Sequence, residues 1–170
     1  MGDIKYFVVI TMAYILCHGL TALLVTPIQQ EFLSEVTIFA SLVYLPHGVR
    51  VLATWLWGWK AFFPLYVGTY LSTLIFTPEH EQALIQESLH LAVGAGALSA
   101  LLAFEAMRLL GHNLYAGKSN RIDWKGLLII GAAASVINSV LQSFVYSGVI
   151  LPEHAISTFM TYAVGDLVGL

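Results

Sequence analysis

The run KYFVVITMAYILCHGLTALLVTP, residues 5–27, is apolar along nearly its whole length and carries its one lysine at its first position. A helix needs about 20 residues to cross the roughly 30 Å hydrocarbon core of a bilayer, so this run is long enough for one crossing. It has little basic charge before it and no small-residue cleavage site after it, so a removable signal peptide is not indicated. The chain is 58% hydrophobic and 10% charged, with a mean hydropathy of +0.81. This composition predicts an integral membrane protein.

Further apolar runs follow the first one, separated by short polar segments. An open sheet cannot satisfy its backbone in lipid, and the runs lack the period-two alternation of barrel strands. We therefore predict an all-α fold, a bundle of about six transmembrane helices that forms one integral membrane domain over residues 1–170. The last run is short for a complete crossing, and we expect the natural chain to continue past Leu170. The runs after the first are Val36–Trp57, Ala61–Thr77, Glu87–Leu110, Trp124–Ile150 and the residues from Ala155 onward.

Basic and acidic residues occupy alternate links between the runs. Lysine and arginine precede the first run and occur again in the second and fourth links, and by the positive-inside rule these segments face the cytoplasm. Both termini are then expected to be cytoplasmic. No basic cluster suited to binding phosphates is present, which argues against nucleic acid as a partner. The basic residues are Lys5, Lys60, Arg108, Lys118, Arg121 and Lys125, and the opposite links carry Glu31, Glu35, Glu79, Glu81, Glu87 and Glu153.

Arg50 lies inside the second apolar run, in the stretch YLPHGVRVLATWLWG, residues 44–58. A charged side chain near mid-membrane costs about 3 kcal/mol even on the most lenient scale, so Arg50 should face the bundle interior and have an anionic partner. Helix positions place Asp166 at nearly the same depth, and Asp166 is our first candidate for that partner. Glu105, near the inner end of the fourth run, is the second. Such a pair would either fix helix packing or line a polar ligand cavity.

The residues around Arg50 favour a cavity. Pro46 should free the carbonyl of Leu42 and kink the helix, Gly48 allows close backbone approach, and His47 adds a titratable group. Two amides one turn apart on the fifth run also need hydrogen-bond partners, either in the cavity or across helices. The predicted polar core therefore comprises Arg50, Asp166, His47, Asn138 and Gln142.

Small residues recur every four positions on the fourth and fifth runs and predict close helix packing. A lone cysteine, Cys17, excludes an internal disulfide and a cysteine-based zinc site, and no metal site is predicted. His18 and His47 fall at similar depths on the first two runs, which leaves a haem with these two axial ligands as an alternative. The small-residue stripes are Ala92, Gly96 and Ala100 on one run and Gly131, Ser135, Ser139 and Ser143 on the other.

Two segments resemble the membrane-associated sensor (MASE) domains that precede bacterial histidine kinases and diguanylate cyclases. The stretch LPHGVRVLATWLWGWKAFFPLYVGTYL, residues 45–71, is similar to the proline- and glycine-spaced motif of that family. The ending YAVGDLVGL, residues 162–170, resembles its Gly-Asp-x-x-Gly motif. The residues that carry the resemblance are Pro46, Gly48, Gly58 and Gly68 in the first segment and Gly165, Asp166 and Gly169 in the second.

The resemblance implies a stand-alone or truncated sensory module of the bacterial inner membrane. Such a module binds an unknown small ligand and relays a signal to a cytoplasmic kinase or cyclase domain or to a partner membrane protein. The alternative is a substrate-binding membrane subunit, because six hydrophobic helices in this length also resemble the vitamin-type subunits of energy-coupling-factor transporters. An HExxH motif, a Gly-x-Ser-x-Gly motif and a Walker loop do not occur in the sequence, so we do not expect an enzyme.

Overall fold

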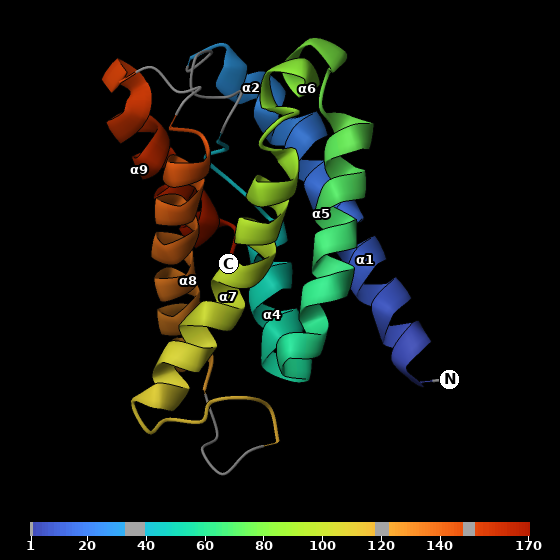
Figure 1. The fold of residues 1–170 in the computed structure, drawn as a ribbon, viewed down its shortest axis with the longest axis vertical. Helices are drawn as coiled ribbons and strands as arrows, with labels where there is room; N and C mark the ends of the chain where they lie inside the picture. The colour runs from blue at the N-terminus through green and yellow to red at the C-terminus, as the bar shows by residue number, and fades with distance from the viewer. Residues whose placement is uncertain (1, 33–39, 118–122, 148–151) are drawn as a thin grey trace.

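The computed structural model describes residues 2–32, 40–117, 123–147 and 152–170 (Figure 1). All regular secondary structure in these ranges is helical, which confirms the predicted all-α class. The chain begins with α1 (Gly2–Leu20), the π-helix η1 (Thr21–Val25) and α2 (Thr26–Gln30), which follow one another directly. The remaining elements are α4 (Pro46–Trp57), the 3-10 helix η2 (Gly58–Ala61), α5 (Phe62–Phe76), α6 (Glu79–Ile85), α7 (Leu89–Leu109), α8 (Trp124–Val145) and α9 (Pro152–Val168).

Three of the described helical segments are long and apolar enough to cross a membrane, namely 2–30, 89–109 and 124–145. A shorter apolar helix covers residues 156–168. Large apolar side chains on these helices point outward, with exposed fractions of 68% at Leu23, 67% at Ile129 and 73% at Phe144. Polar side chains instead fill much of the interior. This inverted distribution suits a bundle surrounded by lipid.

The second apolar run does not form one continuous helix. The predicted helix over Val36–Trp57 is wrong for residues 40–45, which are non-helical, and residues 36–39 lie outside the described part of the chain. The helix α4 begins only at Pro46 and at 1.5 Å per residue measures about 18 Å. Pro46 therefore starts a helix, where its missing N–H removes no helical hydrogen bond, and the predicted kink that frees the Leu42 carbonyl is not found.

Side chains of the first helical segment satisfy the backbone of residues 40–45. Gln29, which is 4% exposed, donates from Nε2 to the carbonyl of Ala40 at 2.8 Å and accepts from the Leu42 amide at 2.7 Å. The Thr21 hydroxyl donates to the Val43 carbonyl at 3.3 Å. Non-helical backbone at membrane depth is tolerated where protein groups replace water in this way.

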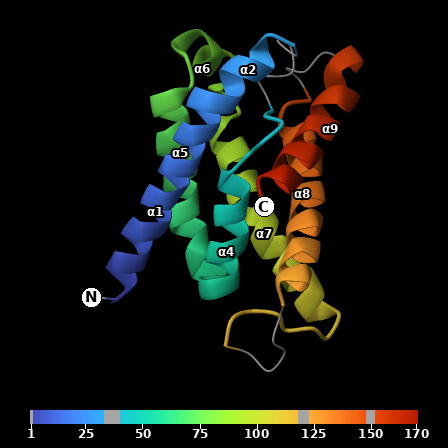
Figure 2. The same cartoon turned by 180° about the vertical axis from the view of Figure 1, so that it is seen from behind.

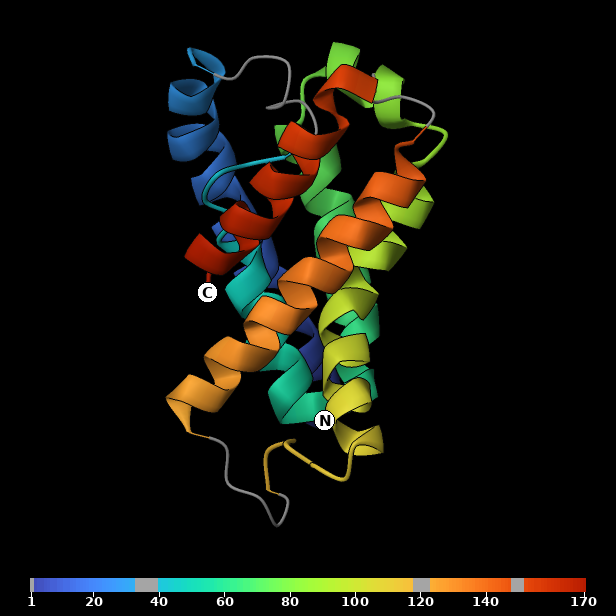
Figure 3. The ribbon, with the colours of Figure 1, turned by 90° about the vertical axis from the view of Figure 1, so that its left-hand side faces the viewer.

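The two segments that carry the family resemblance lie against each other. The helix α9 descends along residues 40–45 toward the start of α4 (Figure 3), and the Tyr44 amide donates to the Gly165 carbonyl at 2.9 Å. A Cβ atom at Gly165 would overlap the Ser41 carbonyl, and one at Gly169 would overlap the Tyr44 carbonyl. A Cβ at Gly48 would lie 2.9 Å from the Gly169 oxygen. These glycines permit close contact between backbones.

Other small residues pack helices together as predicted. The stripe residues of α7 and α8 are buried except Ser143, which is half-buried. A Cβ at Gly68 of α5 would lie 3.0 Å from the Tyr14 Cβ of α1, so this glycine brings those two helices together. Gly58 has a φ of 58° and ends α4 in the left-handed region that favours glycine.

Alternate links gather at opposite ends of the bundle. The N-terminus, η2 and the α7–α8 link lie at one end, and α2, α6 and the start of α9 lie at the other (Figures 1 and 2). An ion pair of 3.8 Å between Lys60 Nζ and Asp3 Oδ1 joins the start of α1 to η2. The helix α6 was not predicted. Lys118, Arg121 and Glu35 lie outside the described residues.

Candidate functional site

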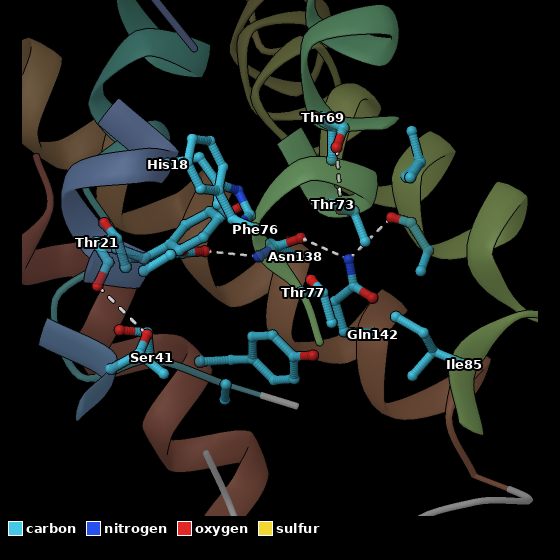
Figure 4. A pocket seen from close by; sticks show the side chains of 18 of the residues that line it. His18, Thr21, Ser41, Thr69, Thr73, Phe76, Thr77, Ile85, Asn138 and Gln142 are labelled. Atoms are coloured by element: carbon cyan, nitrogen blue, oxygen red, sulfur yellow. Dashed lines mark hydrogen bonds between the residues drawn. The ribbon is translucent and has the colours of Figure 1, made fainter. Parts of the chain in front are cut away.

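A cavity of about 300 Å³ lies inside the bundle, in the half that contains α2 and α6. Its lining comes from many elements of the bundle: α1, η1 and α2, residues 40–44, α4, α5, α6, α7, α8 and α9. Figure 4 shows threonines of α5 on one wall, with His18 and Thr21 of the first helical segment near Phe76 and the amides of α8 between them. The hydroxyl and amide side chains of the lining include Thr21, Ser41, Thr69, Thr73, Thr77 and Gln142.

Arg50 lines this cavity and is 3% exposed. Its Nη2 donates to the Tyr14 hydroxyl at 2.8 Å and to the Tyr44 hydroxyl at 3.4 Å, and its guanidinium carbon lies 5.6 Å and 5.1 Å from the two ring centroids. Nε and Nη1 are buried and have no hydrogen-bond partner among the described residues. A Cβ at Gly96 of α7 would lie 2.7 Å from Nη2, so that glycine makes room for the guanidinium.

Asp166 lines the same cavity and is 1% exposed. Its Oδ2 accepts from Asn138 Nδ2 at 2.7 Å and lies 3.4 Å from His47 Nδ1. His47 Nε2 lies 3.0 Å from the carbonyl of Gly131. Because a carbonyl can only accept, Nε2 carries a hydrogen, and Nδ1 faces the Asp166 carboxylate. Three helices, α4, α8 and α9, thus meet in one polar group.

The predicted ion pair between Arg50 and Asp166 does not form. Both residues line one cavity. However, the described contacts of the Asp166 carboxylate are Asn138 and His47, while those of the guanidinium are two tyrosines. His47 contacts α8 at Gly131 and α9 at Asp166, and so it takes the place beside the carboxylate that was predicted for Arg50.

The second predicted partner, Glu105, lies in a separate cluster near the α7–α8 link. Its Oε1 accepts from the Tyr115 hydroxyl at 2.8 Å and from Arg108 Nη1 at 3.1 Å. Burial and the neighbouring carboxylate raise the pKa of Tyr115 above its ordinary value. Glu105 is therefore paired away from Arg50.

The two predicted amides, Asn138 and Gln142, both line the cavity and form hydrogen bonds across helices. Gln142 Nε2 donates to the Ala92 carbonyl of α7 at 3.0 Å and lies 3.4 Å from Asn138 Oδ1. Gln142 also lines the cavity, and its Oε1 is buried without a partner in the described structure. It joins two helices and leaves one acceptor free.

His18 and His47, the alternative axial pair of a haem, lie in different surroundings. His18 lines the cavity, with its ring 6.0 Å from the Phe76 ring and nearly parallel to it. His47 is fully buried, and its two nitrogens face Gly131 and Asp166. Across the described ranges, no group of three or more histidine, cysteine, aspartate or glutamate side chains could hold a metal ion.

The sequence interpretation missed the tyrosines that contact Arg50. A signal for one of them exists, because Thr11, Tyr14, His18 and Thr21 recur at helical spacing on one face of the first apolar run. Thr11, Tyr14 and Thr21 are buried, so this polar face points into the bundle. Tyr44 carries no such periodic signal, since it lies in the non-helical segment.

No protein-family model, curated protein or solved structure matches this chain. The resemblance to the MASE family therefore stays a prediction.

Proposed function

We propose that this chain is an integral membrane module that binds a small polar ligand in the cavity beside Arg50. The observation that carries the proposal is a cavity of about 300 Å³ that holds a 97%-buried guanidinium with free donors. A buried cation with unsatisfied donors is costly in a low-dielectric interior, so this arrangement is more typical of a binding site than of packing alone. The polar lining from several helices supports the same proposal.

In this proposal the chain is a multi-pass protein of the bacterial inner membrane with cytoplasmic termini. Support comes from the basic residues in alternate links and from the common end shared by the N-terminus, η2 and the α7–α8 link. We replace Cys17 by alanine and introduce cysteine at exposed Glu79 or His112. An impermeant external reagent should label the first cysteine and spare the second. The opposite pattern would reverse the orientation.

Ligand binding would reach the cytoplasmic end through α4. Arg50 lies at the cavity, and the same helix continues to Trp57 and η2 near the start of α1. A ligand that moves the guanidinium therefore moves a helix that leads to the opposite end of the bundle. By the family resemblance, the receiver there is a kinase or cyclase domain.

A substrate-binding subunit of a transporter is the second candidate function. It is favoured because α4 begins at the cavity, inside the bundle, and is preceded by non-helical backbone (Figure 2). Transporter binding sites are commonly formed by such interrupted helices. Purification of the tagged chain from its native membrane distinguishes the two, since an accompanying ATPase pair supports transport and a kinase or cyclase supports sensing.

Ligand binding in the cavity is tested by thermal unfolding in detergent with a library of small metabolites. A compound that binds only the folded state raises the Tm. Thr73→Trp fills the cavity, whereas Leu74→Trp adds the same ring at a 42%-exposed neighbouring position. We expect at least one compound to stabilise the parent and Leu74→Trp but not Thr73→Trp. A library without any such compound would contradict the proposal.

A further inference from the structure

We infer that the ligand is a small organic carboxylate whose anionic group binds the free donors of Arg50. This inference rests on the proposed function and adds the chemical class of the ligand.

The Arg50 guanidinium has more hydrogen-bond donors than described partners. An arginine has five N–H donors, of which the two on Nη2 face the hydroxyls of Tyr14 and Tyr44. The three on Nε and Nη1 have no partner among the described residues, although both atoms are buried. Neutral hydroxyls and ring faces stabilise the cation without neutralising it. Three donors of the guanidinium are therefore left for a further acceptor.

Asp166 is the one aspartate among the described lining residues. Its carboxylate accepts from Asn138 Nδ2 at 2.7 Å and lies 3.4 Å from His47 Nδ1. It makes no ion pair with Arg50 in the described structure. A ligand anion can thus bind the guanidinium without displacing an existing ion pair.

The cavity lining carries one arginine, Arg50, and one acidic side chain, Asp166, so it tolerates at most a single added negative charge, whereas a phosphate monoester brings about −1.5 to −2. A planar carboxylate also fits the geometry of a guanidinium. A volume of about 300 Å³ lies at the lower end of the range for small-molecule sites and so suits a small ligand.

The cavity also holds hydrogen-bond acceptors. Gln142 Oε1 is buried in the same cavity without a described partner. Thr69 and Thr73 already donate their hydroxyl hydrogens to the carbonyls of Leu65 and Thr69, so they are left to accept. A ligand with a carboxylate and a hydroxyl or amino group would pair its carboxylate with Arg50 and donate a hydrogen to these acceptors.

The test measures the Tm of the detergent-solubilised protein with hydroxy acids, amino acids and mono- and dicarboxylates at constant ionic strength. Each acid is paired with its carboxamide, which keeps the shape and removes the carboxylate, and inorganic phosphate is included. We expect at least one acid to give a saturable rise in Tm that its amide does not give. Arg50→Gln should abolish that rise, whereas Arg108→Gln, at an exposed position, should keep it.

Gly96→Ala keeps the test decisive if Arg50→Gln does not fold. The added Cβ would lie 2.7 Å from Nη2 and should shift the guanidinium without removing its charge. We expect the apparent Kd for the acid to rise at least about tenfold, as when one charge-assisted hydrogen bond is lost. An unchanged Kd would overturn the assignment of Arg50.

The set of compounds that stabilise the protein distinguishes a wrong ligand class from a failure of ligand binding. If only amides, other neutral compounds or phosphate stabilise the parent and not Thr73→Trp, the carboxylate is wrong and ligand binding stands. If no compound does so, both proposals are wrong.

Discussion

The two halves of the bundle are built in opposite ways. Near the α7–α8 link, the side chains of Val51, Phe104 and Ile130 form a dry apolar cluster in which each is at most 1% exposed. Toward α2 and α6, the same helices line a cavity with both polar and apolar side chains, among them a buried arginine and aspartate. The helix α4 runs from one half into the other. One half therefore holds the helices together by apolar packing, and the other half leaves an open space among polar side chains.

The largest effect is expected at Gly165, where α9 meets residues 40–45 beside the cavity. Valine there would place its Cβ on the Ser41 carbonyl, a backbone atom that cannot move aside without breaking the contact between α9 and residues 40–45. We expect Gly165→Val to yield no folded protein by gel filtration in detergent. Gly94→Ala is the control, since its Cβ would meet Tyr66 at an ordinary 3.9 Å. Normal folding of Gly165→Val would mean that this contact is dispensable.

The packed half should lose more stability on truncation than the cavity half. Phe104 is fully buried, so Phe104→Ala removes a ring from close packing and should lower the free energy of unfolding by about 3 to 5 kcal/mol. Leu102→Ala on the same helix, at a 43%-exposed position, should change it far less. Chemical unfolding in detergent measures both. Equal losses would show that the cluster is not closely packed.

The sequence predicted the packed half better than the cavity half, for a physical reason. Apolar runs and four-residue stripes depend on local helical periodicity, and so they identified the helices and the buried faces of α7 and α8. The start of α4 depends instead on distant groups, because Gln29 and Thr21 satisfy the backbone of residues 40–45. A run such as SLVYLP, residues 41–46, does not reveal such partners.

The sequence predicted which residues line the candidate site, but not which of them contact one another. Arg50, Asp166, Asn138 and Gln142 all line the cavity, because polar residues in an apolar helix face inward. His47 is buried beside the cavity as a partner of Asp166 and does not line it. Depth along a helix fixes a level in the bundle but not a rotation about the axis, so it could not select between partners.

The polar core should show energetic coupling that an exposed ion pair lacks. A double-mutant cycle of Asn138→Ala and Asp166→Ala should give a coupling of about 1.5 to 3 kcal/mol, because the hydrogen bond is buried and charge-assisted. The same cycle at Asp3 and Lys60, whose side chains are 90% and 60% exposed, should give less than about 1 kcal/mol. Similar couplings at both places would remove the distinction between buried and exposed polar groups.

The smallest effect is expected inside the cavity itself. Thr73 is half-buried and lines open space, and its hydroxyl donates within α5 to Thr69 at 2.9 Å. Thr73→Ala therefore removes few packing contacts and should lower the free energy of unfolding by less than about 1 kcal/mol. Its effect should appear in ligand response, since a lining hydroxyl is lost. The opposite result would be an unchanged gain in Tm with a stabilising compound and a loss of several kcal/mol in the free energy of unfolding. It would show that this wall of α5 belongs to the packed half.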